Sequence, residues 1–214
     1  MKKGATELVL IIDRSGSMSG LESDTIGGIN GILREHRQLD ENCLISIVLF
    51  NHTTKALFDR QPIYKVRNLT ESDYKPAGST ALLDAVGNSI SHISKVQGYL
   101  PEEFRAEHVI FAITTDGLEN SSKKFTKQEL RKLIEAKQEM GWEFLYLGAN
   151  VDAFEEGASI GIARDRIANY VPDDRGTERM FHSIAVGTAR ILESPGRIDG
   201  SWADDVNEDY ESRK

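Results

Sequence analysis

The sequence has a single cysteine, Cys43, and no long apolar run. One cysteine cannot form an internal disulfide, so a reducing compartment fits the chain better than secretion does. No apolar segment approaches the length of a membrane span, and the short apolar run that follows the N-terminal residues 1–7 is typical of a strand rather than a signal peptide. We therefore expect a cytoplasmic protein that does not enter a membrane.

The chain also has fewer positively charged than negatively charged residues. The chain has 26 Lys and Arg residues against 34 Asp and Glu residues, which gives a formal net charge of -8. A field of this sign opposes binding to nucleic acid and to anionic membranes. The 214 residues, of which 39% are hydrophobic and 28% charged, have the composition of one ordinary globular domain. We expect that domain to be monomeric on its own.

Several signatures of catalysis are missing. The sequence contains no P-loop and no dinucleotide-binding fingerprint. Ser15 and Ser17 lie outside any Gly-x-Ser-x-Gly elbow, which argues against a serine hydrolase. The five histidines are scattered without a ligand-like pair, so zinc chemistry has no support.

The most informative stretch of the chain follows its first apolar run, residues 8–12. That run predicts a buried parallel strand, and Asp13, Ser15 and Ser17 come directly after it. Open α/β sheets bind ligands at the carboxyl edge of their strands. The three residues alternate, so a turning loop can bring their oxygens to one point, and oxygen ligands suit a hard cation such as Mg²⁺, Mn²⁺ or Ca²⁺.

Two other interpretations of this loop need weighing. An EF-hand loop would have Gly at its sixth position and Glu at its twelfth, where this chain has Met18 and Asp24, so that interpretation fails. The serines could also simply satisfy backbone groups where a strand turns into a helix, as most Ser-Gly-Ser loops do. The loop alone leaves this second alternative open.

Thr80 lies at the beginning of a second candidate segment. It precedes a helical stripe of apolar residues formed by Leu83, Val86, Ile90 and Ile93. The Thr80 hydroxyl is either an ordinary helix N-cap or a cation ligand. Asp84 follows one turn later on the same face, where it would orient Thr80 or a bound water, unless it is only a solvated carboxylate.

Asp116 belongs to a third candidate segment. The apolar strand predicted over residues 108–114 is followed by Thr115-Asp116-Gly117. Two carboxylates at the ends of two buried parallel strands, Asp13 and Asp116, repel each other, and a divalent cation between them relieves that repulsion. This second carboxylate strengthens the hypothesis of a metal site.

The remaining pattern predicts an α/β fold. Capping boxes formed by Ser19 with Glu22 and by Thr126 with Glu129 indicate two helix starts. Further elements are predicted as a helix over 21–36, a strand over 43–50 with a hairpin partner over 55–58, a loop over 59–75, a strand over 142–147, an Asp152-capped helix through 158, a weak strand over 166–171 and a helix over 177–192. We expect a doubly wound, mostly parallel central sheet with one antiparallel edge strand and helices on both faces.

Asp13, Ser15, Ser17, Thr80 and Asp116 together resemble the metal-ion-dependent adhesion site of a von Willebrand factor A-type (vWA) domain. Three separate segments agree with that family in residue type, order and predicted local structure, which makes the resemblance specific. The resemblance covers nearly the whole chain. We accordingly predict a single vWA-like domain over residues 1–193 and a loosely attached, polar and acidic tail over residues 194–214.

The resemblance implies a Rossmann-like fold with a divalent cation, Mg²⁺ foremost and Mn²⁺ or Ca²⁺ as alternatives, at the carboxyl edge. In that family the residues matching Ser15, Ser17 and Thr80 coordinate the ion directly, and those matching Asp13 and Asp116 act directly or through water. It further implies that a protein partner supplies an Asp or Glu carboxylate to the ion. Without a secretion signal or a disulfide, the chain is similar to the intracellular bacterial or phage-type members, some of which work in assemblies with an ATPase.

An enzyme is the alternative hypothesis. Aspartates at strand ends also occur in phosphotransfer folds, where Asp13 would be the nucleophile of a metal-dependent phosphotransferase or phosphatase. The residue two positions later is Ser15 rather than a second Asp, however, and no Lys occupies a position suited to clamping phosphate. We rank a non-enzymatic binding module above this alternative.

Overall fold

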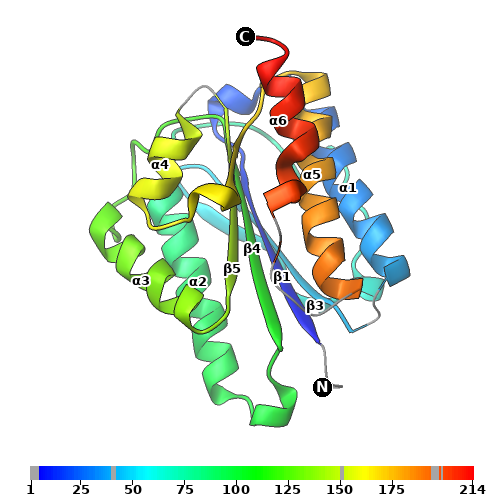
Figure 1. The fold of residues 1–214 in the computed structure, drawn as a ribbon, viewed down its shortest axis with the longest axis vertical. Helices are drawn as coiled ribbons and strands as arrows, with labels where there is room; N and C mark the ends of the chain where they lie inside the picture. The colour runs from blue at the N-terminus through cyan, green and yellow to red at the C-terminus, as the bar shows by residue number, and fades with distance from the viewer. Residues whose placement is uncertain (1–4, 40–41, 150–151, 194–197, 199) are drawn as a thin grey trace.

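The computed structural model describes residues 5–39, 42–149, 152–193, 198 and 200–214. The described strands form one sheet of six in the order β3-β2-β1-β4-β5-β6 (Figure 1). They are β1 Thr6–Asp13, β2 Leu44–Phe50, β3 Thr54–Pro62, β4 His108–Thr115, β5 Glu143–Gly148 and β6 Ile167–Asn169. Every neighbouring pair is parallel except β2 with β3, which is antiparallel. The predicted sheet with an antiparallel edge strand is confirmed.

Helices cover both faces of the sheet, as Figure 1 shows. The α-helices are α1 Glu22–Leu39, α2 Leu82–Tyr99, α3 Lys127–Glu139, α4 Ala153–Ser159, α5 Asp174–Glu193 and α6 Asp204–Glu211. Short 3-10 turns are η1 Gly16–Met18, η2 Ile63–Lys65, η3 Glu102–Phe104, η4 Arg164–Arg166 and η5 Gly200–Ala203. Helices α1 and α5 pack together on one face, and α2, α3 and α4 lie on the other.

Strand β1 lies in the middle of the sheet and is buried along its whole length. Its side chains alternate between two cores, because successive residues of a strand point to opposite faces. Leu10 packs in the core under α1 and α5, whereas Val9 and Ile11 pack in the core under α2 and α3. Such two-sided burial explains why the strand is a continuous apolar run.

The start of α1 differs from the prediction. The expected capping box between Ser19 and Glu22 does not form. The helix begins at Glu22, and the Glu22 carboxylate accepts its hydrogen bond from the Gly20 N–H at 2.8 Å. Gly28 of α1 packs closely against α5, since a Cβ added there would lie 2.2 Å from Cδ2 of Phe181. Strand β3 is also longer than predicted and ends at Pro62.

The end of the chain corrects another prediction. Residues 200–211, expected to belong to a loosely attached tail, form η5 and α6, and α6 packs against α5. Trp202 is only 1% exposed, and Val206 is fully buried in the core under α1 and α5. Asp209 forms ion pairs with Arg175 and Arg213. The acidic composition of this segment concealed an amphipathic helix whose apolar side completes the core.

Within the described part of the chain, none of the helices combines the length and the apolar character that a membrane crossing requires.

Candidate metal site

Asp13 is the last residue of β1, and its side chain is 0% exposed. Oδ1 accepts a hydrogen bond from the Ser15 N–H at 2.7 Å, and Oδ2 accepts one from the Thr115 hydroxyl at 2.7 Å. The Tyr74 hydroxyl donates to the Asp13 carbonyl oxygen at 2.6 Å. The carboxylate is therefore held in place by neutral donors from β4 and from its own loop.

The two loop serines connect Asp13 to Asp116. After β1 the chain turns through η1, and this turn brings Ser15 Oγ within 3.0 Å of Ser17 Oγ. The Ser17 hydroxyl donates to Asp116 Oδ1 at 2.6 Å. The alternating oxygens of the loop thus converge beside the carboxylate that follows β4.

Thr80 joins the same cluster. A Cβ added at Gly117 would lie 3.1 Å from Thr80 Oγ1 and 3.5 Å from Ser17 Oγ, so both hydroxyls flank one glycine. The N-cap of α2 is Ala81, and no side chain caps that helix start. Thr80, which is 3% exposed, is consequently not the helix cap. Five side chains from three segments of the chain meet at one edge of the sheet.

Backbone hydrogen bonds hold Thr80 against the loop that follows β4. The Thr80 N–H donates to Asn120 Oδ1 at 2.9 Å, and the Thr80 carbonyl accepts from the N–H groups of Asn120 and Ser121. Glu119 accepts from the N–H groups of Leu83 and Ser122. Sequence analysis missed these roles, and its only available signal was the polar Glu-Asn pair shortly after Asp116.

The loop before Thr80 is tied to the first loop. The Gly16 N–H donates to the Gly78 carbonyl at 2.9 Å, and the Ala77 N–H donates to the Arg14 carbonyl at 2.9 Å. Gly78 has a φ of +80°, and a Cβ there would lie 2.3 Å from His52 Nδ1, so this turn requires glycine. These links set the position of Thr80 relative to the two serines.

Asp84 forms contacts that neither of the two predicted alternatives included. Its carboxylate accepts hydrogen bonds from the N–H groups of Lys123, Lys124 and Phe125 at 2.8 to 3.0 Å. It therefore connects the first turn of α2 to the loop after β4 instead of pointing its oxygens at Thr80. A carboxylate is well suited to this task because it offers several acceptor positions at once.

The surroundings of both aspartates in the cluster disfavour their charged forms. Burial raises the pKa of Asp13 to about 6, against the opposing effect of its hydrogen bonds, and the charge of Asp116 adds to the rise. Burial likewise raises the pKa of Asp116. Among the described residues, no Lys, Arg or His side chain forms an ion pair with either carboxylate. These residues thus supply no counter-charge to the two aspartates.

The donor set fits a hard divalent cation. It consists of three hydroxyls and two carboxylates, all oxygen, which Mg²⁺, Mn²⁺ and Ca²⁺ prefer, whereas zinc favours nitrogen and sulfur. In the described part of the chain, no three His, Cys, Asp or Glu side chains gather in a way that could hold a metal. Any ion at this edge would consequently depend on the hydroxyls of Ser15, Ser17 and Thr80.

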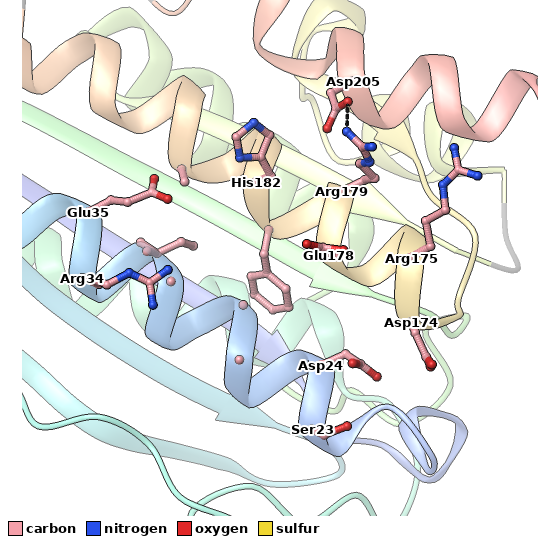
Figure 2. A pocket seen from close by; sticks show the side chains of 16 residues that line it. Ser23, Asp24, Arg34, Glu35, Asp174, Arg175, Glu178, Arg179, His182 and Asp205 are labelled. Carbon is pink, nitrogen blue, oxygen red and sulfur yellow. Dashed lines mark hydrogen bonds and ion pairs between the residues drawn. The ribbon is translucent and has the colours of Figure 1, made fainter.

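A second concave region lies between α1 and α5 and is shown in Figure 2. Its floor contains glycines of α1 together with Phe181, and charged side chains form its rim. Arg179 is paired with Asp205, while burial and the nearby charge of Asp174 raise the pKa of Asp24. The five candidate ligands do not line this groove. It is therefore separate from the candidate metal site.

No protein-family model and no curated protein matches the sequence. Solved structures do resemble the fold. The vWF domain of the type V pili tip protein Mfa5 from Porphyromonas gingivalis superposes with a TM-score of 0.62 at 11% identity, covering 91% of this chain and 98% of that one. The SpRpn10 VWA domain has a TM-score of 0.55 at 9% identity, covering 83% and 94%.

A third solved structure is proximal thread matrix protein 1 from the mussel byssus, with a zinc-occupied MIDAS motif, which has a TM-score of 0.57 at 14% identity. The superposition covers 85% of this chain and 45% of the mussel protein. Similarly, this chain spans 62% of the length of the PilB minor pilin from Streptococcus sanguinis. These identities establish the fold alone. The fold of this chain is that of a vWA domain.

Proposed function

We propose that the chain is a protein-binding module in which Asp13, Ser15, Ser17, Thr80 and Asp116 hold a divalent cation, Mg²⁺ foremost, as a metal-ion-dependent adhesion site. One observation carries the proposal. Five oxygen-bearing side chains from three segments converge on the carboxyl edge of the sheet, and within the described ranges neither of the two carboxylates forms an ion pair with a cationic side chain.

The chemistry of this donor set defines what it would bind. Two carboxylates balance the charge of a divalent cation, while three neutral hydroxyls are weak donors, so the ion would still attract one more anionic oxygen. An Asp or Glu side chain of a protein partner supplies such an oxygen. A single contact of this kind is small, and the loops around the ion must provide the remaining interface.

The solved structures with this fold support the same kind of function. One carries zinc in its MIDAS motif, and others are pilus components, including an adhesin. We propose that the present chain acts in the cytoplasm, as a monomer until it meets its partner, within an assembly of the intracellular vWA type.

The geometry around Asp13 argues against the enzymatic alternative. A phosphoryl acceptor needs a carboxylate oxygen that a substrate can approach in line. Asp13 is 0% exposed, and both of its oxygens already accept hydrogen bonds. Phosphoryl transfer to this residue therefore remains the lower-ranked hypothesis.

Mn²⁺ provides a direct test because a bound Mn²⁺ ion relaxes the water in its open coordination position. The wild-type chain should bind Mn²⁺ and enhance water relaxation, and acetate should reduce that enhancement by taking the open position. Thr80→Val, which removes a ligand and keeps the side-chain shape, should weaken Mn²⁺ binding about tenfold or more. The control Thr54→Val, on the exposed edge strand, should bind like the wild type.

A partner captured from the native host should be released by chelator and displaced by a high concentration of glutamate. Unchanged Mn²⁺ binding in Thr80→Val, or partner binding that survives removal of the metal, would contradict the proposal.

A further inference from the structure

Tyr170 has a buried hydroxyl without a partner. The residue is 1% exposed, and no group of the described residues forms a hydrogen bond with its Oη. Leaving a buried hydroxyl unsatisfied destabilises the folded state relative to pairing it. Phenylalanine would fill the same space without this cost, so the hydroxyl calls for an explanation outside folding.

The position of Tyr170 places it beside the candidate metal site. It directly follows β6, and its N–H donates to the Gly148 carbonyl at 3.0 Å. Ala149, which follows Gly148 in the chain, donates its N–H to the Thr115 carbonyl at 3.0 Å. Tyr170 is thus linked through two backbone hydrogen bonds to the residue that precedes Asp116.

A second tyrosine in the same core shows what such a hydroxyl can do. Tyr74 packs in the same apolar cluster as Tyr170, and its hydroxyl donates to the Asp13 carbonyl at 2.6 Å. Burial, and after it the charges of Asp116 and Asp13, raises the pKa of Tyr170 well above its ordinary value. The Tyr170 hydroxyl therefore keeps its proton and can act as a hydrogen-bond donor.

Asp116 has an acceptor to spare. Its Oδ1 receives the Ser17 hydroxyl, and among the described residues no other side chain donates a hydrogen bond to this carboxylate. Carboxylates that hold metal ions are themselves oriented by hydrogen bonds from neighbouring groups, and loss of such a bond weakens metal binding by about 10- to 100-fold.

We propose that Tyr170 is a positioning residue of the metal site, whose hydroxyl donates a hydrogen bond to the Asp116 carboxylate, directly or through one water, when the cation is bound. This inference rests on the proposed function. The Tyr74 hydroxyl already forms its hydrogen bond in the metal-free structure. The Tyr170 hydroxyl forms its hydrogen bond only when the cation is bound.

The two tyrosines give a matched pair of variants, Tyr170→Phe and Tyr74→Phe, each of which removes one hydroxyl and keeps the ring. In EDTA, Tyr170→Phe should melt at the wild-type temperature or above it, because it loses no hydrogen bond. Its affinity for Mn²⁺, measured by calorimetry, should fall about tenfold. Tyr74→Phe should instead melt at a lower temperature in EDTA.

A spectroscopic readout separates positioning from packing. Mg²⁺ should produce an ultraviolet difference spectrum of tyrosine in the wild type, and Tyr170→Phe should lose that signal. The inference alone is overturned if the wild type binds Mn²⁺ and Tyr170→Phe binds it equally well, or if both variants melt equally early. If the wild type binds no divalent cation, the proposed function and the inference fall together.

Discussion

Strand β1 carries a buried carboxylate near each end, and the two carboxylates have different kinds of hydrogen-bond partners. Glu7, near the beginning of the strand, is 0% exposed; its Oε1 accepts from Arg60 Nε at 2.6 Å and its Oε2 from Gln97 Nε2 at 2.6 Å. Among the described residues, the donors to Asp13, at the other end, are neutral groups of Ser15 and Thr115. Glu7 is paired with a cationic side chain, whereas no ion pair to Asp13 occurs in the part of the chain that the structure describes.

The difference indicates which end is structural and which is functional. Arg60 reaches Glu7 although its φ of +46° is a conformation that residues other than glycine rarely adopt, so the chain accepts backbone strain to place that charge. At the Asp13 end a second carboxylate, Asp116, stands where a cation would be expected. The simplest account is that the cation at this end comes from solution.

Breaking the Glu7 end should have the largest effect on stability. Arg60→Met leaves a buried carboxylate without its counter-charge, which typically costs about 3–5 kcal/mol. Denaturant titration should show this loss, and it should be the same with and without Mg²⁺. In the double variant with Glu7→Gln, much of the stability should return. If Arg60→Met lowered the free energy of unfolding by less than about 1 kcal/mol, the pair of Glu7 and Arg60 would behave like an exposed ion pair and not like a buried one.

His36 sharpens the comparison because it is a buried titratable group that stays neutral. Its Nε2 contacts the Thr188 hydroxyl at 2.6 Å, and burial lowers its pKa to about 4. Between pH 6.5 and 4 the unfolded chain binds a proton that the folded chain does not, so the unfolding free energy should fall as the pH falls through this range. The full effect is about 3 kcal/mol.

The measurement is denaturant stability as a function of pH for the wild type and for His36→Gln. The difference between the two curves isolates this residue from the carboxylates. Parallel curves over that range would mean that His36 is charged in the folded protein or exposed in solution.

A smaller effect is expected at Asp84, which lies near the site without belonging to it. Asp84→Ala removes the acceptor of three backbone N–H groups in the loop after β4 and should cost about 1–2 kcal/mol. Thermal melts should nonetheless rise with Mg²⁺ as in the wild type. Loss of the Mg²⁺ response with unchanged stability would instead restore the predicted contact of Asp84 with the metal shell.

The sequence alone was sufficient for the elements whose pattern is local. The apolar runs predicted the strands, and the capping box of Thr126 with Glu129 marks the start of α3 as expected. Asp152 caps α4 in the same way. The alternation of strands and helices was enough for the parallel sheet, because few topologies satisfy it.

Features that depend on contacts between distant segments could not be predicted in this way. Nothing local distinguishes Asp84, which binds a loop about forty positions later, from a carboxylate that faces a ligand. Trp202 and Val206 are separated by Ala203 and two aspartates, and only the presence of α5 opposite them makes their burial favourable. The burial of the Tyr170 hydroxyl likewise has no local signal in the sequence.

The most direct test of the central claim is thermal melting of the wild type and of Asp116→Asn at increasing Mg²⁺. The account predicts that the wild-type Tm rises with the ion by mass action. Asp116→Asn should melt no earlier than the wild type in EDTA, because it loses an uncompensated buried charge, and its Tm should not respond to Mg²⁺. A wild-type Tm that ignores Mg²⁺, or an equal rise in Asp116→Asn, would contradict the claim that this edge of the sheet receives its cation from solution.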